Sequence, residues 1–297
     1  MLSRSYLDKG RKDISIVKWI KRITITILLL ILLGIGLFLY SRYIEPFLLI
    51  TVNYTKEVPS DVKETKIVFF TDTHFGKYYD DSNLEKIVEK INAAEPDIVV
   101  FGGDFFDDYA RDKALLDMDS ITKQLSAIKA KYAKVAVYGN HDYGGGAQWI
   151  YKSVLEEGGF LILRNDTLFL EELNFDIIGV DDHMFGSIDE ELYQLSEDKF
   201  HLVITHEPDV ADHFLSQGEN LLIAGHSHGG QVKLPFLTEK VLPSGAKKYV
   251  DGEYIIEKEG ASKETNLYVS SGIGMTNMPY RFLNIPEIVV ITLQPVK

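Results

Sequence analysis

One stretch indicates both the fold and the chemistry of this chain: LLIAGHSHGGQ, residues 221–231. Its first four residues are apolar and predict a short buried strand, and Gly225 begins the turn that follows. His226 and His228 stand two residues apart between glycines, a setting that does not suit packing into a core. Two imidazoles in such a turn can point to two nearby places. They would suit a pair of adjacent metal ions, provided that other parts of the chain supply further ligands.

Four further loops share this arrangement, because each starts where a predicted buried strand ends and each carries ligand-type side chains. The strands are predicted at 66–70, 97–101, 134–138 and 200–205. The ligand-type residues that follow them are Asp72, His74, Asp104, Asn140, His141 and His206. Since ligands of open α/β sheets bind at the carboxyl ends of the strands, we expect all five loops to converge in one crevice.

Five of the eight histidines lie at these strand ends. The other three, His183, His201 and His213, are interpreted as ordinary surface or core histidines. His183 is the exception to watch, because Asp181-Asp182-His183 also follows a predicted strand. The chain has no cysteine, so any metal ion must be held by His, Asp, Glu or Asn.

Helical patterns separate the first strands, so the first half of the chain alternates between strand and helix. SNLE, residues 82–85, has the pattern of a capping box and precedes a helix with one apolar face. Further helices are predicted at 118–128 and 148–157. This alternation predicts a parallel sheet covered by helices. Additional strands are predicted at 47–52, 248–257, 267–270 and 287–293, with short antiparallel strands within 160–180.

An uncharged apolar segment lies near the start of the chain, at residues 23–41. As a helix its first 18 residues would span roughly 27 Å, close to the hydrocarbon core of a bilayer. A buried core helix is one alternative, but no face of the segment is polar enough for water. A cleaved signal peptide is another, yet no small-x-small site follows. We expect an uncleaved transmembrane anchor at 23–41, preceded by a basic tail at 1–22 and followed by a linker and first strand at 42–65.

Charge is distributed unevenly along the chain, whose net charge is −13. Residues 1–22 carry seven basic and two acidic side chains, so this tail has a charge of +5 and the remainder −18. The positive-inside rule places the tail in the cytoplasm and the main domain on the other side of the cell membrane. The acidic body argues against long nucleic acids as substrates and suits the binding of cations. Nothing in the sequence indicates an obligate protein partner.

The order of these motifs resembles that of the calcineurin-like metallophosphoesterases. The family pattern is D-x-H, G-D, G-N-H-D/E, a single H and G-H-x-H, and all five blocks occur here between residues 72 and 228. The resemblance covers about residues 66–293. It implies hydrolysis of a phosphoester by a metallophosphoesterase domain over 66–297. The implied fold is α/β, a four-layer αββα sandwich of two mixed sheets.

The resemblance also implies two divalent metal ions, Mn, Fe or Zn, that share one carboxylate. The implied ligands are Asp72, His74 and His228 for the first ion, Asn140, His206 and His226 for the second, and Asp104 as the bridge. Carboxylate, amide and imidazole donors suit such ions. A bridged pair would hold a hydroxide for in-line attack on phosphorus.

Two further residues are expected in catalysis. His141 is implied to donate a proton to the leaving oxygen or a hydrogen bond to a phosphoryl oxygen. Asp107 could orient His141, or it could be a solvated acid in the loop. Phosphoprotein phosphatases of this superfamily carry an arginine directly after the second Asp of this motif, where this chain has Asp108. That difference favours a phosphodiester over a phosphoprotein, because a diester has less charge to neutralise.

The segment 272–287 resembles a membrane-anchored bacterial subgroup related to the pyrophosphatases that cleave UDP-2,3-diacylglucosamine. In this interpretation Arg281 meets a substrate phosphate, and the alternative is a surface arginine on a glycine-rich turn. The tether favours a lipid-linked or nucleotide-linked substrate and a role in glycolipid metabolism. The rival functions are a nucleotide phosphodiesterase or phosphomonoesterase and a non-catalytic membrane-tethered sensor, which would normally have lost a ligand or His141.

Overall fold

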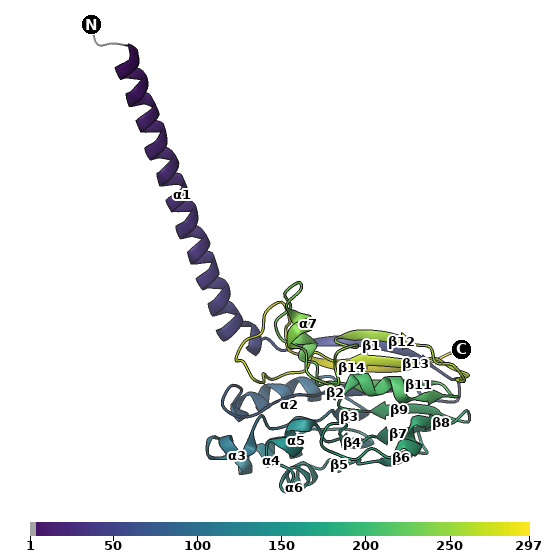
Figure 1. Ribbon diagram of the computed structural model, residues 1–297. Coiled ribbons are helices and arrows are strands. Elements are labelled where there is room, and N and C mark those ends of the chain that lie inside the picture. Colours follow the sequence, from purple (N-terminus) through teal and green to yellow (C-terminus); the bar gives the residue numbers. More distant parts are fainter. Residues whose placement is uncertain (1–3) are drawn as a thin grey trace.

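Two six-stranded sheets stack on one another, and a long N-terminal helix projects away from them (Figure 1). The computed structural model describes residues 4–297, with side chains described from residue 16 onward. The first sheet has the strand order β1-β14-β2-β3-β4-β5, and the second has the order β12-β13-β11-β9-β7-β6. Each combines parallel and antiparallel pairs, so the prediction of two mixed sheets is confirmed.

The strands are short, and most of them are buried. Those of the first sheet are β1 (Ile50–Val58), β2 (Thr65–Phe70), β3 (Ile98–Phe101), β4 (Ala133–Ala136), β5 (Leu161–Ile162) and β14 (Glu287–Pro295). Those of the second are β6 (Asp166–Leu170), β7 (Phe175–Gly179), β9 (Phe200–Ile204), β11 (Asn220–Ala224), β12 (Gly252–Ile256) and β13 (Thr265–Val269). A separate pair is formed by β8 (Gln194–Leu195) and β10 (Leu215–Ser216).

The helices are α1 (Arg4–Tyr43), α2 (Leu84–Ala93), α3 (Tyr109–Asp112), α4 (Met118–Ser126), α5 (Asn140–Gly144), α6 (Tyr151–Glu157) and α7 (Thr238–Val241). The 3₁₀ turns are η1 (Glu45–Phe47), η2 (Asp81–Asn83), η3 (Lys113–Leu115), η4 (Glu190–Tyr193), η5 (Pro208–His213) and η6 (His228–Gly230).

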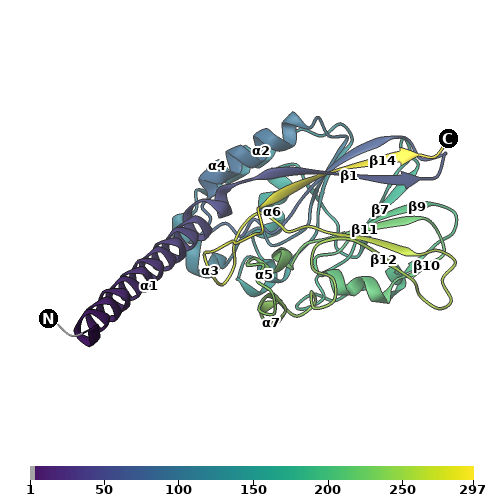
Figure 2. The same cartoon turned by 90° about the horizontal axis from the view of Figure 1, so that it is seen from above.

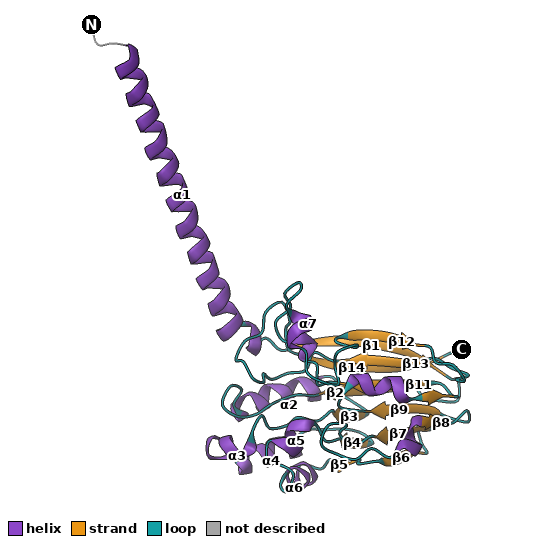
Figure 3. Ribbon diagram, in the orientation of Figure 1, coloured by secondary structure: helices purple, strands orange, loops and turns teal. Residues whose placement is uncertain are grey.

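The alternation of side chains along each strand builds three apolar layers. In β2, Ile67 and Phe69 point between the two sheets, while Val68 and Phe70 point to the helices. The outer face of the first sheet packs against α2, α4 and α6 (Figure 3). The outer face of the second sheet is covered by the 3₁₀ turns η4 and η5 and by loops. The αββα order is therefore present, with its last layer built from single turns.

Three local predictions were wrong in detail. The capping box at 82–85 does not form, because Asp80 accepts from the Ser82 N–H and caps η2, while Asn83 makes no side-chain cap. The strand predicted from residue 47 begins only at Ile50, after a turn that contains Pro46. Within 160–180, β6 and β7 pair antiparallel as predicted, but β5 joins the first sheet in parallel.

Helix α1 is longer than the predicted anchor, because the basic segment continues the same helix. Residues 16–47 have a mean hydropathy of 2.7 in their most apolar window, and none of that window is buried in the body. The helix is thus long and apolar enough to cross a membrane, and the buried core helix is excluded. Residues 1–3 of the predicted tail lie outside the described residues. Viewed from above, α1 projects from one end of the body and the C-terminus lies at the other (Figure 2).

Candidate metal centre

The loops that follow β2, β3, β4, β9 and β11 meet at one edge of the two sheets, as predicted. Strands β2, β3 and β4 are parallel neighbours, and so are β9 and β11, so their carboxyl ends lie together. Close packing of the loops depends on Gly103, whose φ is 94°. A Cβ there would lie 2.6 Å from the backbone nitrogen of Gly139. Only glycine lets these two loops approach one another so closely.

Backbone strain gathers at the predicted ligands. Five of them have a left-handed φ between 44° and 64°, a region that residues other than glycine seldom occupy: Asp72, His74, Asp104, His226 and His228. Such conformations cost free energy and persist where the surrounding structure enforces them, commonly at functional sites. The strain marks the same residues that the strand-end pattern selected.

A first cluster consists of Asp72, His74 and His228, all buried. The Nε2 atom of His228 lies 3.5 Å from Asp72 Oδ1 and 3.0 Å from His74 Nε2. The Nε2 atom of His74 lies 3.9 Å from the same Asp72 oxygen. Ligand atoms about 2.0–2.2 Å from one ion stand roughly this far apart. The three side chains are therefore placed so that they could bind one divalent cation.

A second cluster consists of Asp104, His206 and His226. The Oδ2 atom of Asp104 lies 3.1 Å from His206 Nε2 and 3.3 Å from His74 Nε2, a ligand-type atom of the first cluster. One carboxylate oxygen thus stands between the two clusters. This is the position that a bridging ligand requires.

Two ligand-type atoms of the residues predicted to bind the second ion are buried without a partner. Asn140 Oδ1 and His206 Nε2 are buried and have no hydrogen-bond partner among the described residues. The other nitrogen of His206 donates to the Gly102 carbonyl at 2.8 Å, and Nε2 of His226 donates to that of Ser244 at 2.7 Å. These bonds leave His206 Nε2 and His226 Nδ1 as lone-pair donors. Asp104, His206 and His226 therefore fit a divalent ion, and Asn140, which lines one cavity together with Asp104 and His226, is the candidate for a fourth donor.

Asp142 holds the neighbouring loops together. Its carboxylate accepts from the N–H groups of Asp104, Phe105 and Gly139 at 2.8–2.9 Å. Burial and the charge of Asp104 nevertheless raise the pKa of Asp142 to about 8. Its contacts are with the backbone of the ligand loops, so Asp142 supports these loops rather than the chemistry.

In the two clusters, neighbouring carboxylates and imidazoles shift one another's pKa values. Burial alone would raise the pKa of Asp104, but the surrounding histidines outweigh it and lower that pKa well below its usual range. Burial opposes a charge on His74, yet Asp107, Asp72 and Asp104 raise its pKa to about 10. The pKa of His206 is raised against burial as well, chiefly by Asp104.

The pKa values of the other two histidines, His226 and His228, are lowered instead of raised. Burial, helped by the neighbouring His206, lowers the pKa of His226 to about 4. Burial also lowers the pKa of His228. Without metal, His74 and His206 would therefore bind protons that a metal ion must displace, whereas His226 and His228 offer free lone pairs.

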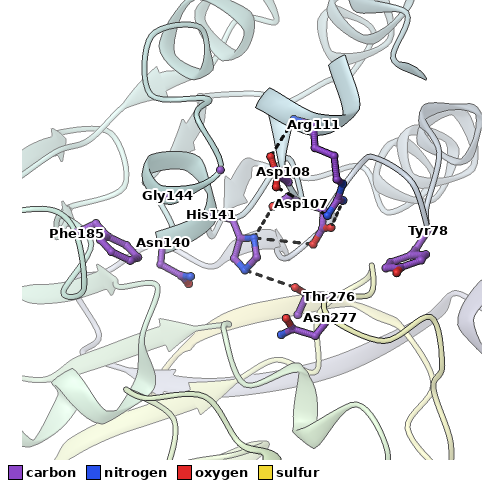
Figure 4. A pocket seen from close by; sticks show the side chains of 11 residues that line it. Tyr78, Asp107, Asp108, Arg111, Asn140, His141, Gly144, Phe185, Thr276 and Asn277 are labelled. Carbon is purple, nitrogen blue, oxygen red and sulfur yellow. Dashed lines mark hydrogen bonds and ion pairs between the residues drawn. The ribbon is translucent and has the colours of Figure 1, made fainter. Parts of the chain in front are cut away.

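His141 stands at the rim of this centre and borders an open cavity of about 430 Å³ (Figure 4). Its Nδ1 donates to the backbone carbonyl of Asp107, and its Nε2 faces Thr276 Oγ1 at 3.5 Å. The Asp107 carboxylate lies 3.9 Å from His141 Nδ1, but 3.4 Å from His74 Nδ1. Asp107 is buried and so is not a solvated loop acid. It positions His141 through its carbonyl and backs His74 with its carboxylate.

Arg111 is a cavity residue that sequence reasoning missed. It projects from the short helix α3 and lines the same cavity (Figure 4). Its guanidinium donates to the Asp107 carboxylate at 2.7 Å and also pairs with Asp112. Asp107 lies just before α3, so the pair spans the start of this helix, and their spacing of four residues in the sequence was the available signal.

Arg281 is fully buried, so the alternative of a surface arginine is wrong. Its guanidinium donates to the carbonyls of Gly274 and Ser271 at 2.8–3.0 Å. Its Nη2 atom also lies 3.2 Å from Nδ1 of His228. The arginine thus stands behind a predicted metal ligand, with its donors directed at the backbone. A contact between Arg281 and a substrate phosphate stays a prediction.

The three histidines set aside in the sequence stay apart from both clusters. His201 is buried, with Nδ1 3.6 Å from the Asp176 carboxylate. His183 and His213 pack near one another, with ring centroids 6.2 Å apart. The backbone N–H of His183 donates to Glu207. None of the three belongs to a metal-type group within residues 16–297.

Residues 65–230 match the family model of the calcineurin-like phosphoesterases. The chain belongs to this family. The matched segment contains every predicted metal ligand and both predicted catalytic residues. The chain is accordingly a metal-dependent phosphoesterase, whose family normally binds two divalent metal ions and whose structure presents two His/Asp groups able to hold them.

Several bacterial members of the family are similar to the chain. Uncharacterized metallophosphoesterase YkuE of Bacillus subtilis is 36% identical over 266 residues, which cover 86% of this chain and 89% of that protein. Uncharacterized metallophosphoesterase Cj0846 of Campylobacter jejuni is 31% identical, and the match covers 80% of this chain but only 61% of that protein. Phosphodiesterase YaeI of Escherichia coli is 26% identical, with 79% of this chain and 85% of that protein covered.

Proposed function

We propose that this phosphoesterase hydrolyses a phosphodiester or a pyrophosphate with two divalent ions, manganese being our first choice. The proposed ligands are Asp72, His74 and His228 for the first ion, and Asn140, His206 and His226 for the second, with Asp104 shared. The observation that carries this proposal is the position of Asp104 Oδ2, within 3.3 Å of an imidazole nitrogen on each side. When bound, the ions would lower the pKa of a shared water and neutralise charge on the phosphoryl group.

His141 is the proposed general acid. A carbonyl can only accept, so its contact with the Asp107 carbonyl fixes a proton on Nδ1. Nε2 then faces the cavity and can deliver a second proton to the leaving oxygen. Asp107 orients this imidazole through its carbonyl and orients His74 through its carboxylate.

The charge of the cavity supports a diester. Arg111 is the cationic side chain that lines it, and this guanidinium is already paired with Asp107 and Asp112. Asp108 lies beside it and adds negative charge. A dianionic monoester would meet more repulsion and less compensation here than a diester with a single charge.

The apolar helix α1 supports a substrate in or near a membrane. We propose that the chain is anchored by this helix, with its N-terminus in the cytoplasm and its catalytic domain on the other face, as the basic residues in the N-terminal part of the helix favour. A lipid-linked or nucleotide-linked phosphoester, of which UDP-2,3-diacylglucosamine is one example, fits that location. The name of the Escherichia coli relative, a phosphodiesterase, supports the diester reaction.

The test uses the full chain, purified in non-ionic detergent, stripped of metal and reloaded with Mn²⁺. We expect hydrolysis of bis-p-nitrophenyl phosphate to depend on Mn²⁺ and to exceed that of p-nitrophenyl phosphate. A preference for the monoester would overturn the diester proposal. Faster turnover of a cyclic nucleotide than of any other diester would favour the nucleotide phosphodiesterase instead. Stoichiometric Mn²⁺ binding without turnover of any ester would favour the non-catalytic, membrane-tethered sensor instead.

A further inference from the structure

An apolar groove of about 520 Å³ lies between the end of α1 and the catalytic body. Three parts of the chain form it: the last turns of α1, the segment around α7, and the segment 278–282 that carries Arg281. Its walls include Leu37, Phe38, Leu234, Leu237, Tyr280 and Phe282. Ser41 and the Tyr280 hydroxyl are its few polar groups, so the groove suits hydrocarbon rather than water.

The groove adjoins a second cavity, of about 230 Å³, which is distinct from the 430 Å³ cavity beside His141. Its lining residues include Asp104, His226 and His228 of the metal centre. Val232, Val241 and Met278 line both this cavity and the groove. One end of a ligand could therefore contact the ligands of the metal ions while its other end lies along α1.

Hydrogen bonds fix the position of α1 against the groove. The backbone N–H of Arg281 donates to the Ser41 carbonyl at 3.0 Å, and the buried Glu45 carboxylate accepts from the Asn284 N–H. The Phe38 and Tyr280 rings are 5.4 Å apart. The helix is thus joined to the segment that carries Arg281, whose side chain lies behind His228.

The position of the groove along α1 indicates what kind of molecule occupies it. On α1 it runs from Gly34 to Ser41, about 10 Å at 1.5 Å per residue, inside the uncharged apolar segment. Arg42 and Tyr43 follow, as side chains that prefer the membrane–water boundary. If α1 spans a bilayer, this wall of the groove lies among lipid tails and not in water.

The body presents exposed apolar side chains at the same level. Around α7, Phe236 is 87% exposed, Leu237 54% and Val241 57%. Figure 1 shows α7 on the side of the body from which α1 rises. Exposed apolar residues gathered beside a membrane helix mark a surface that dips into the lipid.

We infer that the groove binds a hydrocarbon chain of a membrane lipid whose phosphoester head group enters the metal centre. This inference rests on the proposed phosphodiesterase function and names a binding site for the apolar part of its substrate. The lipid would slide from the bilayer along α1, with Val232, Val241 and Met278 where its chain meets its head group. A second copy of this chain, placing an apolar helix in the groove, is the competing occupant.

The test compares two diesters with the same leaving group, p-nitrophenyl ethyl phosphate and p-nitrophenyl hexadecyl phosphate. In both, water adds to phosphorus, the bond to p-nitrophenolate breaks, and the alkyl phosphate and a proton are released. The full chain in detergent micelles with Mn²⁺ should show a kcat/KM at least about tenfold higher for the hexadecyl ester, because each buried methylene contributes roughly fourfold.

Two variants separate groove binding from partition into micelles. Leu237→Glu introduces a charge into the groove, and Leu115→Glu introduces the same charge at a similarly exposed site on η3. We expect Leu237→Glu to lower the hexadecyl preference to below about threefold while its rate on the ethyl ester stays within about twofold of wild type. Leu115→Glu should keep both values.

The outcomes distinguish this inference from the function beneath it. Metal-dependent hydrolysis of the ethyl ester with no hexadecyl preference, or a preference that Leu237→Glu retains, would overturn the groove assignment alone. A change of oligomeric state in Leu237→Glu, without loss of the preference, would assign the groove to a second copy. No turnover of either ester by the metal-loaded chain would overturn the proposed function itself.

Discussion

Asp104 lies between the two candidate metal-binding clusters, and these differ in what contacts the outer ring nitrogen of each histidine, the one that faces away from its cluster. In the second cluster, His206 and His226 each donate their outer nitrogen to a neutral backbone carbonyl. In the first, His74 is backed by the Asp107 carboxylate, whereas His228 has the Arg281 guanidinium 3.2 Å from its outer nitrogen. A carboxylate raises the basicity of a ligating histidine and a cation lowers it. The two histidines of the first cluster are therefore supported unequally, and this cluster depends more than the second on the charged residues behind its ligands.

The largest effect should come from the residue that the clusters have in common. Asp104→Ala is expected to weaken both ions and to abolish measurable hydrolysis, because its carboxylate lies between His74 and His206. His226→Ala and His228→Ala serve as the matched pair, each weakening one ion more than the other. Equilibrium dialysis with elemental analysis measures the ions bound per chain. Asp104→Ala with one ion still fully bound would show that the clusters are independent.

A large loss of rate without loss of metal is expected at His141. His141→Ala should lower kcat on bis-p-nitrophenyl phosphate by about 10²–10⁴-fold, the usual contribution of a general acid. Both ions should stay bound, since the Asp104 contact is made by the backbone N–H of residue 141, which alanine retains. Steady-state kinetics and metal analysis on the same preparation check this. Unchanged kcat would show that another group protonates the leaving oxygen.

The asymmetry of the first cluster is tested at Asp107. Asp107→Asn removes the charge behind His74 and should weaken the first ion by about 10–100-fold, the usual cost of losing such a partner. Asp108→Asn is the control, because Asp108 lines the same cavity without touching a ligand. Titration calorimetry with Mn²⁺ resolves the two affinities. Equal losses at both ions, or a matching loss in the control, would contradict the unequal support proposed for the clusters.

The smallest expected effect is a release of protons on metal binding. At pH 7 His74 and His206 bear protons in the metal-free chain, because nearby carboxylates raise both pKa values, while His226, with a pKa of about 4, does not. Loading two ions should thus release about two protons from the histidines, one from each cluster, in addition to a proton from the shared water once it becomes hydroxide, and metal affinity should rise with pH. Calorimetry in buffers of different ionisation enthalpy counts the protons. A release of none would contradict this assignment.

Most of the fold, and the position of the candidate ligands at the strand ends, could be predicted because both depend on local patterns. Apolar runs such as Leu221–Ala224 mark buried strands, and the parallel sheet brings their ends together whatever the loops contain. The positions of the Arg281 and Asp107 side chains could not be predicted in the same way. Each depends on packing between distant segments, as when the Arg281 side chain passes between the Ser271 and Gly274 carbonyls to reach His228.

The apolar groove was also invisible in the sequence. Its walls come from three segments separated by long stretches of chain, and only the fold brings these segments together. The N-terminal apolar helix was predicted from its uncharged run, but only the structure places its last turns against Tyr280 and Phe282. The proposed domain limits and topology stay predictions.

Electron paramagnetic resonance of the Mn²⁺-loaded chain can detect two ions that share Asp104. Two manganese ions bridged by one carboxylate are magnetically coupled, so we expect the multiline spectrum of a coupled pair at two ions per chain. Asp104→Ala, at whatever occupancy it keeps, should lose that coupling. A simple six-line spectrum of isolated Mn²⁺ in the fully loaded wild-type chain would show that Asp104 does not bridge two ions.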